Sequence, residues 1–131
     1  MKSSTKTYSC VNCGTESIWS HQKSNIYCSN TCSGEARFKK TVEKFNLGEV
    51  SERATLRKVL TETVGYKCSC CGISDYNNKP LVLQVDHIDG NAGNNMPTNV
   101  RLICPNCHSQ TDSFSGSNKG SGRAARGLPL R

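Results

Sequence analysis

Residues 68–72 read CSCCG and residues 102–111 read LICPNCHSQT. Both contain a pair of cysteines separated by two residues. A tight turn of that length aims two thiolates at one ion, and a second such turn completes a tetrahedral zinc site with Zn–S bonds of about 2.3 Å. The predicted ligands of this structural zinc are Cys68, Cys71, Cys104 and Cys107.

A second set of closely spaced cysteines lies nearer the N-terminus and predicts a second zinc site. Its expected ligands are Cys10, Cys13, Cys28 and Cys32. Gly14 and Gly72 each come directly after the second cysteine of a pair. A glycine suits this position because a zinc knuckle turns back on itself there with a positive φ. Cys70 is left without a partner, and pairing it with Cys68 would give a cramped one-residue spacer, so we expect it to be a spare thiol.

The composition favours metal sites over disulfides. The chain has 131 residues, 9 of them cysteine, and only 34% of its residues are hydrophobic, so it cannot build a large core. Its first residues, MKSSTK, lack the apolar stretch of a secretion signal, so we expect a reducing compartment. No run approaches the ~20 apolar residues of a membrane-spanning helix, so no membrane association is expected. Buried or redox-active thiols are the alternative for a single pair.

Two helices are expected between the predicted zinc sites. Apolar residues recur at helical spacing from Ser33 to about Leu47, where Gly48 interrupts the pattern. A second helix has Ser51 as its predicted N-cap and Gly65 as its C-terminal stop. The predicted organisation is an N-terminal four-cysteine zinc module (1–33), basic linking helices (34–65), a second metal module (66–114) and a flexible basic tail (115–131).

The second module is expected to combine strand, turn and helix. The aliphatic run from Leu81 to Val85 predicts a strand, and residues 90–95 are turn material. Ordered chain is expected to resume at Pro97 and to lead into a short helix that begins at Pro105. The fold class predicted from these elements is a small α+β protein stabilised by metal.

Basic residues outnumber acidic ones, 17 against 10, which gives a formal net charge of +7. They gather on the linking helices and on the tail, where they could bind a phosphate backbone. On the helices, interleaved glutamates make a merely solvated surface an equal alternative. The candidate DNA-binding residues are Lys39, Lys40, Arg57, Lys58, Arg101, Lys119, Arg123 and Arg126.

Residues that could carry chemistry lie between the paired cysteines of the second module. Residues 86–91 read DHIDGN, Asn99 follows, and His108 comes directly after Cys107. A Mg²⁺ ion needs only one or two protein ligands and keeps several waters, and Asp86 and His108 can supply such ligands. A neutral His87 can then take a proton from a water aimed at phosphorus. Each residue alone is a weak signal, since His108 could equally be packed or replace a zinc ligand.

In this order, framed by paired cysteines, the residues resemble the H-N-H endonuclease family. His87, Asn99 and His108 match the three letters of the family name, and Asp86 matches the acidic residue before the first. The resemblance implies a ββα-metal nuclease module around one catalytic Mg²⁺ or Mn²⁺ held by Asp86 and His108. It also implies that His87 is the general base and that Asn99 holds the loop and orients the His87 ring.

The function expected from this resemblance is metal-dependent nicking or cutting of double-stranded DNA by a monomer. The N-terminal zinc module with its basic helices looks like that of phage-encoded members, which would act in the cytoplasm of a bacterial host. The main alternative is a non-catalytic zinc-containing protein that binds nucleic acid, such as a regulator. A zinc adaptor for other proteins is disfavoured by the basic tail.

Overall fold

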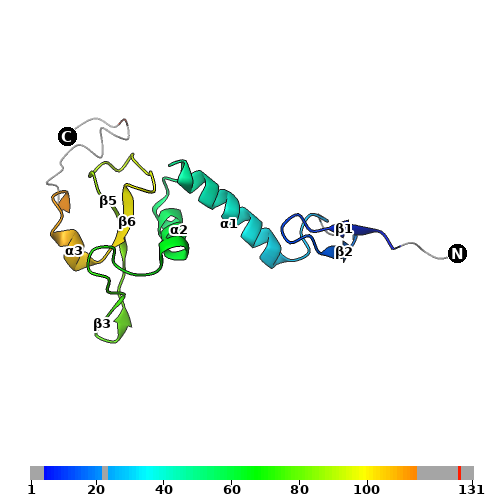
Figure 1. Ribbon diagram of the computed structural model, residues 1–131, viewed down its shortest axis with the longest axis horizontal. Coiled ribbons are helices and arrows are strands. Elements are labelled where there is room, and N and C mark those ends of the chain that lie inside the picture. The colour runs from blue at the N-terminus through cyan, green and yellow to red at the C-terminus, as the bar shows by residue number, and fades with distance from the viewer. Residues whose placement is uncertain (1–4, 22–23, 115–126, 128–131) are drawn as a thin grey trace. The chain divides into compact units, whose positions relative to one another are not determined.

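The computed structural model describes residues 5–21, 24–114 and 127. It divides the chain into two compact units, the first ending at Val42 and the second beginning at Glu43. Helix α1, Asn30–Asn46, contributes residues to both units (Figure 1). The tail residues Lys119, Arg123 and Arg126, expected above to bind DNA, lie outside the described residues.

The first unit contains a short hairpin and most of α1. Strands β1, Thr7–Ser9, and β2, Glu16–Ile18, pair antiparallel, with Tyr8 opposite Ser17. The Tyr8 hydroxyl donates to the backbone carbonyl of Tyr27 (2.9 Å), which ties the hairpin to the segment before α1.

Helix α1 begins three residues before the predicted start at Ser33. The Ser29 hydroxyl accepts a hydrogen bond from the backbone N–H of Cys32 (3.1 Å), an interaction typical of an N-cap. This cap places Cys32 in the first turn of α1. The side chain of Asn12 joins α1 to the preceding knuckle, because it accepts from Lys39 (2.8 Å) and donates to Glu35 (2.6 Å).

Helix α2, Arg53–Val64, begins the packed part of the second unit. Its N-cap is Glu52 and not the predicted Ser51, because the Glu52 carboxylate accepts from the backbone N–H of Thr55. The predicted stop is confirmed, since Gly65 caps the C-terminus with a φ of 100°. One face of the helix is buried, and it comprises Leu56, Val59 and Leu60.

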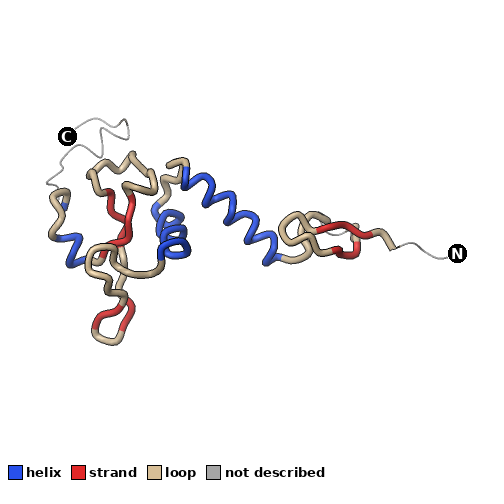
Figure 2. Tube along the Cα trace, in the orientation of Figure 1, coloured by secondary structure: helices blue, strands red, loops and turns tan. Residues whose placement is uncertain are grey.

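The buried face of α2 packs on a two-stranded antiparallel sheet of β5, Gln84–His87, and β6, Val100–Ile103. Helix α3, Pro105–Ser109, follows β6 and packs beside β5, as the tube in Figure 2 shows. The short helix expected from Pro105 is therefore confirmed. A hairpin followed by a helix thus forms the centre of the unit. Its core comprises Phe45, Val50, Leu56, Val59, Leu60, Leu83, Val100, Leu102 and Ile103.

The predicted strand at 81–85 is shifted. Strand β5 begins only at Gln84, because the preceding residues first make a separate hairpin of β3, Asp75–Tyr76, and β4, Lys79–Pro80. The two turn residues of the β3–β4 hairpin, Asn77 and Asn78, have φ values of 53° and 61°. A two-residue hairpin turn of type I′ requires positive φ at both positions. Residues 81–83 form an irregular segment whose last residue, Leu83, is fully buried.

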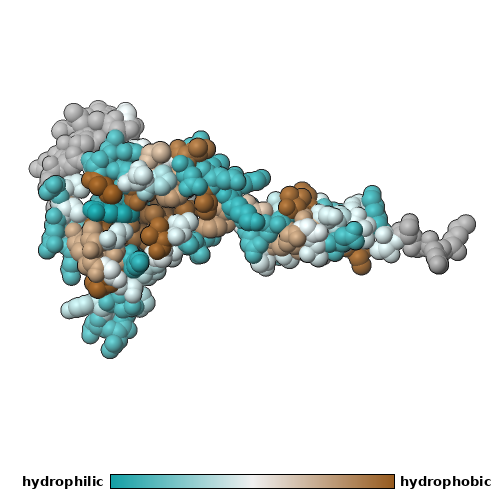
Figure 3. Space-filling view, viewed as in Figure 1, coloured by the Kyte–Doolittle hydropathy of each residue, from teal (hydrophilic) through white to brown (hydrophobic). Residues whose placement is uncertain are grey.

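The surface of both units is mixed in character. In Figure 3 exposed apolar side chains, drawn brown, are scattered among hydrophilic ones. So small a core cannot stabilise every loop, which leaves a role for metal sites. Within the described ranges, no helix has the length and apolar character needed to cross a lipid bilayer.

Candidate active site and metal centres

The second unit brings four cysteine sulfurs together. The Sγ atoms of Cys71 and Cys104 are 3.8 Å apart, and the whole set of Cys68, Cys71, Cys104 and Cys107 lies within 4.8 Å. Bonds of about 2.3 Å to a tetrahedral zinc place two sulfurs about 3.8 Å apart, whereas a disulfide would bring them to about 2.05 Å. The predicted grouping is confirmed, and Cys70 lies outside it as an exposed thiol.

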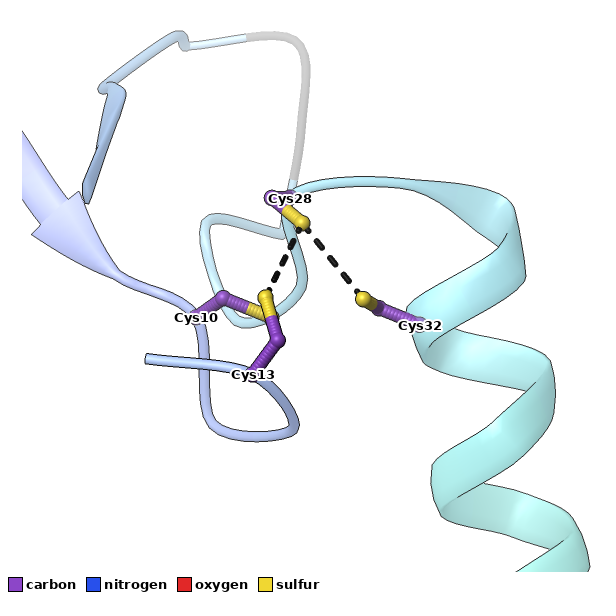
Figure 4. Close-up of side chains that lie close together, drawn as sticks. All are labelled: Cys10, Cys13, Cys28 and Cys32. Atoms are coloured by element: carbon purple, nitrogen blue, oxygen red, sulfur yellow. Dashed lines mark hydrogen bonds between the residues drawn. The ribbon is translucent and has the colours of Figure 1, made fainter. Parts of the chain in front are cut away.

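The first unit repeats this arrangement (Figure 4). The Sγ atom of Cys28 lies 3.6 Å from that of Cys13 and 3.5 Å from that of Cys32. Cys10 completes the predicted group. Gly14 donates its backbone N–H to the carbonyl of Cys10 (2.8 Å) with a φ of 75°.

The matching knuckle of the second unit has the same backbone geometry. Gly72 donates to the carbonyl of Cys68 (2.9 Å) with a φ of 78°. Both glycines therefore adopt the positive φ that the sequence predicted. The repetition of one turn in two unrelated settings shows that the knuckle is a local structure built by the Cys-x-x-Cys-Gly pattern.

Each cluster contains a thiol whose pKa is lowered to about 6. Hydrogen bonding from the backbone of Cys28 lowers the pKa of Cys10 to about 6. Burial opposes ionisation of Cys68, but backbone N–H groups, that of Cys71 first, outweigh it and lower its pKa to about 6. The neighbouring Cys28 has its pKa raised to about 12 by the thiols around it, Cys32 first. A cluster without a cation therefore cannot ionise all its thiols, and a dication is the group that would allow it.

The second cluster fixes the position of His108. Cys104 is the N-cap of α3, and its Sγ accepts from the backbone N–H of Cys107 (3.4 Å). His108 is therefore in the last turn of a short helix anchored by two cluster residues. Its ring Nδ1 is hydrogen-bonded to the Oε1 of Gln84 on β5. With Nδ1 as the donor, Nε2 keeps its lone pair.

Asp86 faces His108 across a short gap. The Asp86 Oδ1 atom lies 3.8 Å from His108 Nε2, and the carboxylate is buried, with 4% of the residue exposed. In an octahedral Mg²⁺ site with bonds of about 2.1 Å, adjacent ligands lie about 3.0 Å apart and opposite ones about 4.2 Å, so the two atoms are near enough to reach one cation after a small shift of either side chain. A carboxylate oxygen is a typical donor for Mg²⁺ or Mn²⁺, whereas an imidazole nitrogen is more typical of Zn²⁺, Cu²⁺, Fe²⁺ or Ni²⁺.

Arg101 holds the other carboxylate oxygen of Asp86. Strand pairing places Arg101 opposite Asp86, and its Nε donates to Oδ2 (2.8 Å). The Arg101 Nε reaches the carboxylate because the two residues are cross-strand neighbours, and binding of DNA by Arg101 stays a prediction. The ion pair leaves Oδ1 directed toward His108.

His87 ends β5, and its ring is held by a residue that the sequence analysis did not select. Its Nε2 lies 2.9 Å from Oδ1 of Asn95, which is 6% exposed. The resemblance implied that Asn99 orients this ring. Instead, the Asn99 amide donates to Asp89 Oδ1 and to the Asn94 carbonyl, both at 2.8 Å. Asn99 therefore holds the loop, as the resemblance implied, while Asn95 contacts the ring.

The loop between β5 and β6 is organised around Asp89. Hydrogen bonds lower the pKa of its carboxyl, that from the Asn94 amide first and that from the Asn91 backbone N–H second. The Asp89 backbone N–H donates in turn to Asn99 Oδ1 (3.0 Å). These bonds define the path of the loop that carries Asn95.

A cleft of about 510 Å³ unites the candidate residues. Asp86, His87 and His108 all line it, together with Arg53 and Arg57 from α2. Asn99 is buried in the loop between β5 and β6. Of the other residues expected to bind DNA, Lys40 and Lys58 are exposed and Lys39 is bonded to Asn12. The arrangement can hold a divalent cation beside a histidine that can accept a proton.

A comparison with curated proteins agrees with the sequence pattern. The chain is 38% identical over 77 residues to the H-N-H endonuclease F-TflIV of Escherichia phage T5. It resembles the H-N-H endonucleases. The match covers 58% of this chain and 34% of the phage protein, so the chain spans about a third of the H-N-H relative. No family profile and no solved structure matches the chain.

Two residues that support the H-N-H pattern were missed in the sequence. Gln84 carries a usable signal, because residues two apart on a strand share a face, and Gln84 lies two before Asp86. Both side chains therefore reach His108. Asn95 has no comparable signal in the sequence, because it is one of three asparagines in the 90–95 turn and only the folded loop distinguishes it from the other two.

Proposed function

We propose that this protein is a metal-dependent H-N-H endonuclease that hydrolyses phosphodiester bonds of double-stranded DNA. The observation that carries the proposal is that Asp86, His87 and His108 line one cleft, with Asp86 and His108 facing each other at 3.8 Å. The phage relative named as an H-N-H endonuclease supports it. The proposal includes a single catalytic divalent cation, Mg²⁺ or Mn²⁺, at Asp86 and His108.

His87 is the general base. Because Asn95 presents an oxygen to Nε2, that nitrogen carries the ring proton and Nδ1 keeps its lone pair. Nδ1 takes a proton from water, whose oxygen bonds to phosphorus as the bond from phosphorus to the 3′ oxygen breaks. The leaving oxygen then takes a proton from solvent.

Asp86 and His108 would hold the cation. When bound, it stabilises negative charge on the leaving 3′ oxygen. Arg101 fixes the Asp86 carboxylate through Oδ2, and Gln84 fixes the His108 ring through Nδ1. Such second contacts orient ligands and are commonly worth 10- to 100-fold in metal affinity.

The two four-cysteine clusters hold structural zinc. The cluster of the second unit anchors α3 and with it His108. The cluster of the first unit joins the knuckle after β1 to the first turn of α1. Neither zinc takes part in the chemistry, because all four of its positions are filled by thiolates.

The test is nicking of supercoiled plasmid DNA by the purified protein with Mg²⁺ or Mn²⁺, with and without EDTA. We expect EDTA-sensitive conversion to the open-circular or linear form. The matched control is Asp86→Asn purified in parallel, which keeps the size of the side chain and should lose cleavage. DNA binding without any nicking would support the non-catalytic alternative, and nicking that survives in the control would indicate a contaminant.

A further inference from the structure

The cleft that holds the candidate active site is also lined by two arginines of α2. Arg53 and Arg57 both line the cleft that Asp86, His87 and His108 line. They are four residues apart, so they lie one above the other on the same side of the helix. Two side chains from a rigid helix therefore point into one site.

The position of these arginines is set by the core. Leu56 and Leu60, each three residues beyond one of the arginines, are buried against the sheet with 0% and 4% exposed. Residues three apart on a helix are neighbours, so the arginines leave α2 at the edge of its buried face. Packing of the leucines thus holds the arginine backbones beside β5.

The residues that line the cleft carry a net positive charge. The lining includes one carboxylate, Asp86, and Arg101 already pairs with it. Among the residues that the structure describes, no ion pair involves Arg53 or Arg57. The nearest acid in the sequence, Glu52, caps the helix instead. Two guanidinium groups therefore face a cleft with no protein anion assigned to them.

We propose that Arg53 and Arg57 form a binding site for the DNA phosphate next to the one that is hydrolysed. This inference rests on the proposed function. Guanidinium groups bind phosphate oxygens in bidentate fashion, which a solvated lysine does less well. The cleft volume, about 510 Å³, is in the range of sites that hold a small organic ligand, so it has room for more than one phosphate group. The arginines would thereby set the register of the strand against His87.

The experiment compares Arg53→Gln and Arg57→Gln with Lys67→Gln in the full chain. Lys67 is an exposed cation of the same unit that lines a separate apolar groove. Duplex cleavage gives kcat/KM, and fluorescence anisotropy in EDTA gives binding at several salt concentrations. Zinc content and melting temperature show that each variant is folded.

We expect each arginine variant to lose about 10- to 100-fold in kcat/KM, the effect of removing a charged hydrogen-bonding partner from phosphate. The slope of log affinity against log salt should fall by about one for each arginine removed. Arg57→Lys should retain more activity than Arg57→Gln, because it keeps the charge. Lys67→Gln should stay within about twofold of wild type in kcat/KM.

If wild type cleaves and the arginine variants behave as Lys67→Gln does, the phosphate site is wrong while the nuclease proposal stands. If wild type does not cleave, the nuclease proposal is wrong. The salt slopes in EDTA then still decide whether the arginines contact phosphate: a loss of about one per arginine supports the contact, and an unchanged slope overturns it.

Discussion

Replacing Asn95 with alanine tests whether this residue determines which nitrogen of the His87 ring carries the proton. The Asn95 oxygen is 2.9 Å from His87 Nε2, and the residue is 6% exposed and is not part of the cleft lining. Alanine removes the acceptor and lets the ring rotate. One such hydrogen bond is worth about 1 kcal/mol, so kcat should fall roughly five- to tenfold. KM should change less than about twofold, because Asn95 does not reach the substrate.

The assay is steady-state cleavage of a labelled duplex, with melting temperature as the measure of folding. Asn95→Asp keeps an oxygen acceptor and should retain most of the kcat that Asn95→Ala loses. Thr98→Ala, an exposed change in the same loop, is the matched control and should behave as wild type. ¹⁵N NMR of the His87 ring reports which nitrogen carries the proton. Wild-type kcat in a folded Asn95→Ala variant, or equal losses in the alanine and aspartate variants, would refute the positioning role.

Other predictions concern the base, the zinc and the tail. His87→Ala should lower cleavage by about 10²- to 10⁴-fold, as expected for a lost general base, with zinc content and DNA affinity near wild type; loss of folding would instead make His87 structural. Zinc affinity should fall as pH falls from 8, since thiols must lose protons to bind, and most steeply below about 6, where Cys10 and Cys68 also become protonated. Zinc content after dialysis at each pH measures this, and a pH-independent content would contradict it. Deletion of residues 117–131 should weaken DNA binding and flatten its salt dependence; unchanged affinity would exclude the tail as a DNA contact.

The metal clusters could be predicted from the sequence because their information is local. A knuckle is set by the spacing of two cysteines and a following glycine, and Gly14 and Gly72 adopt the φ that this pattern needs. The choice of Cys71 over Cys70 followed from the cramped spacer alone, and the structure confirms it. Helix ends were less certain, since Ser51 and Glu52 can both cap and only the Glu52 carboxylate reaches Thr55.

The strand boundary and the partners of the histidines could not be predicted in the same way. The aliphatic run at 81–85 looks like a strand, but residues 81–83 are irregular. Leu83 is nevertheless buried, because burial requires only contact with the core and not strand structure. The bonds of His87 to Asn95 and of Asp86 to Arg101 depend on the register of β5 against β6. A shift by one residue would reverse the faces of the whole strand.

The candidate site can be small because its residues restrain one another. Gln84 and Asp86 share one face of β5, so one strand presents both the partner of His108 Nδ1 and the carboxylate facing its Nε2. The cysteine cluster fixes the helix that carries His108, and the cross-strand Arg101 fixes the Asp86 carboxylate. None of these restraints requires a large apolar core, which 34% hydrophobic residues could not supply. Removing zinc from the second unit should therefore displace His108 from Asp86 before it disrupts the packing of α2 on the sheet.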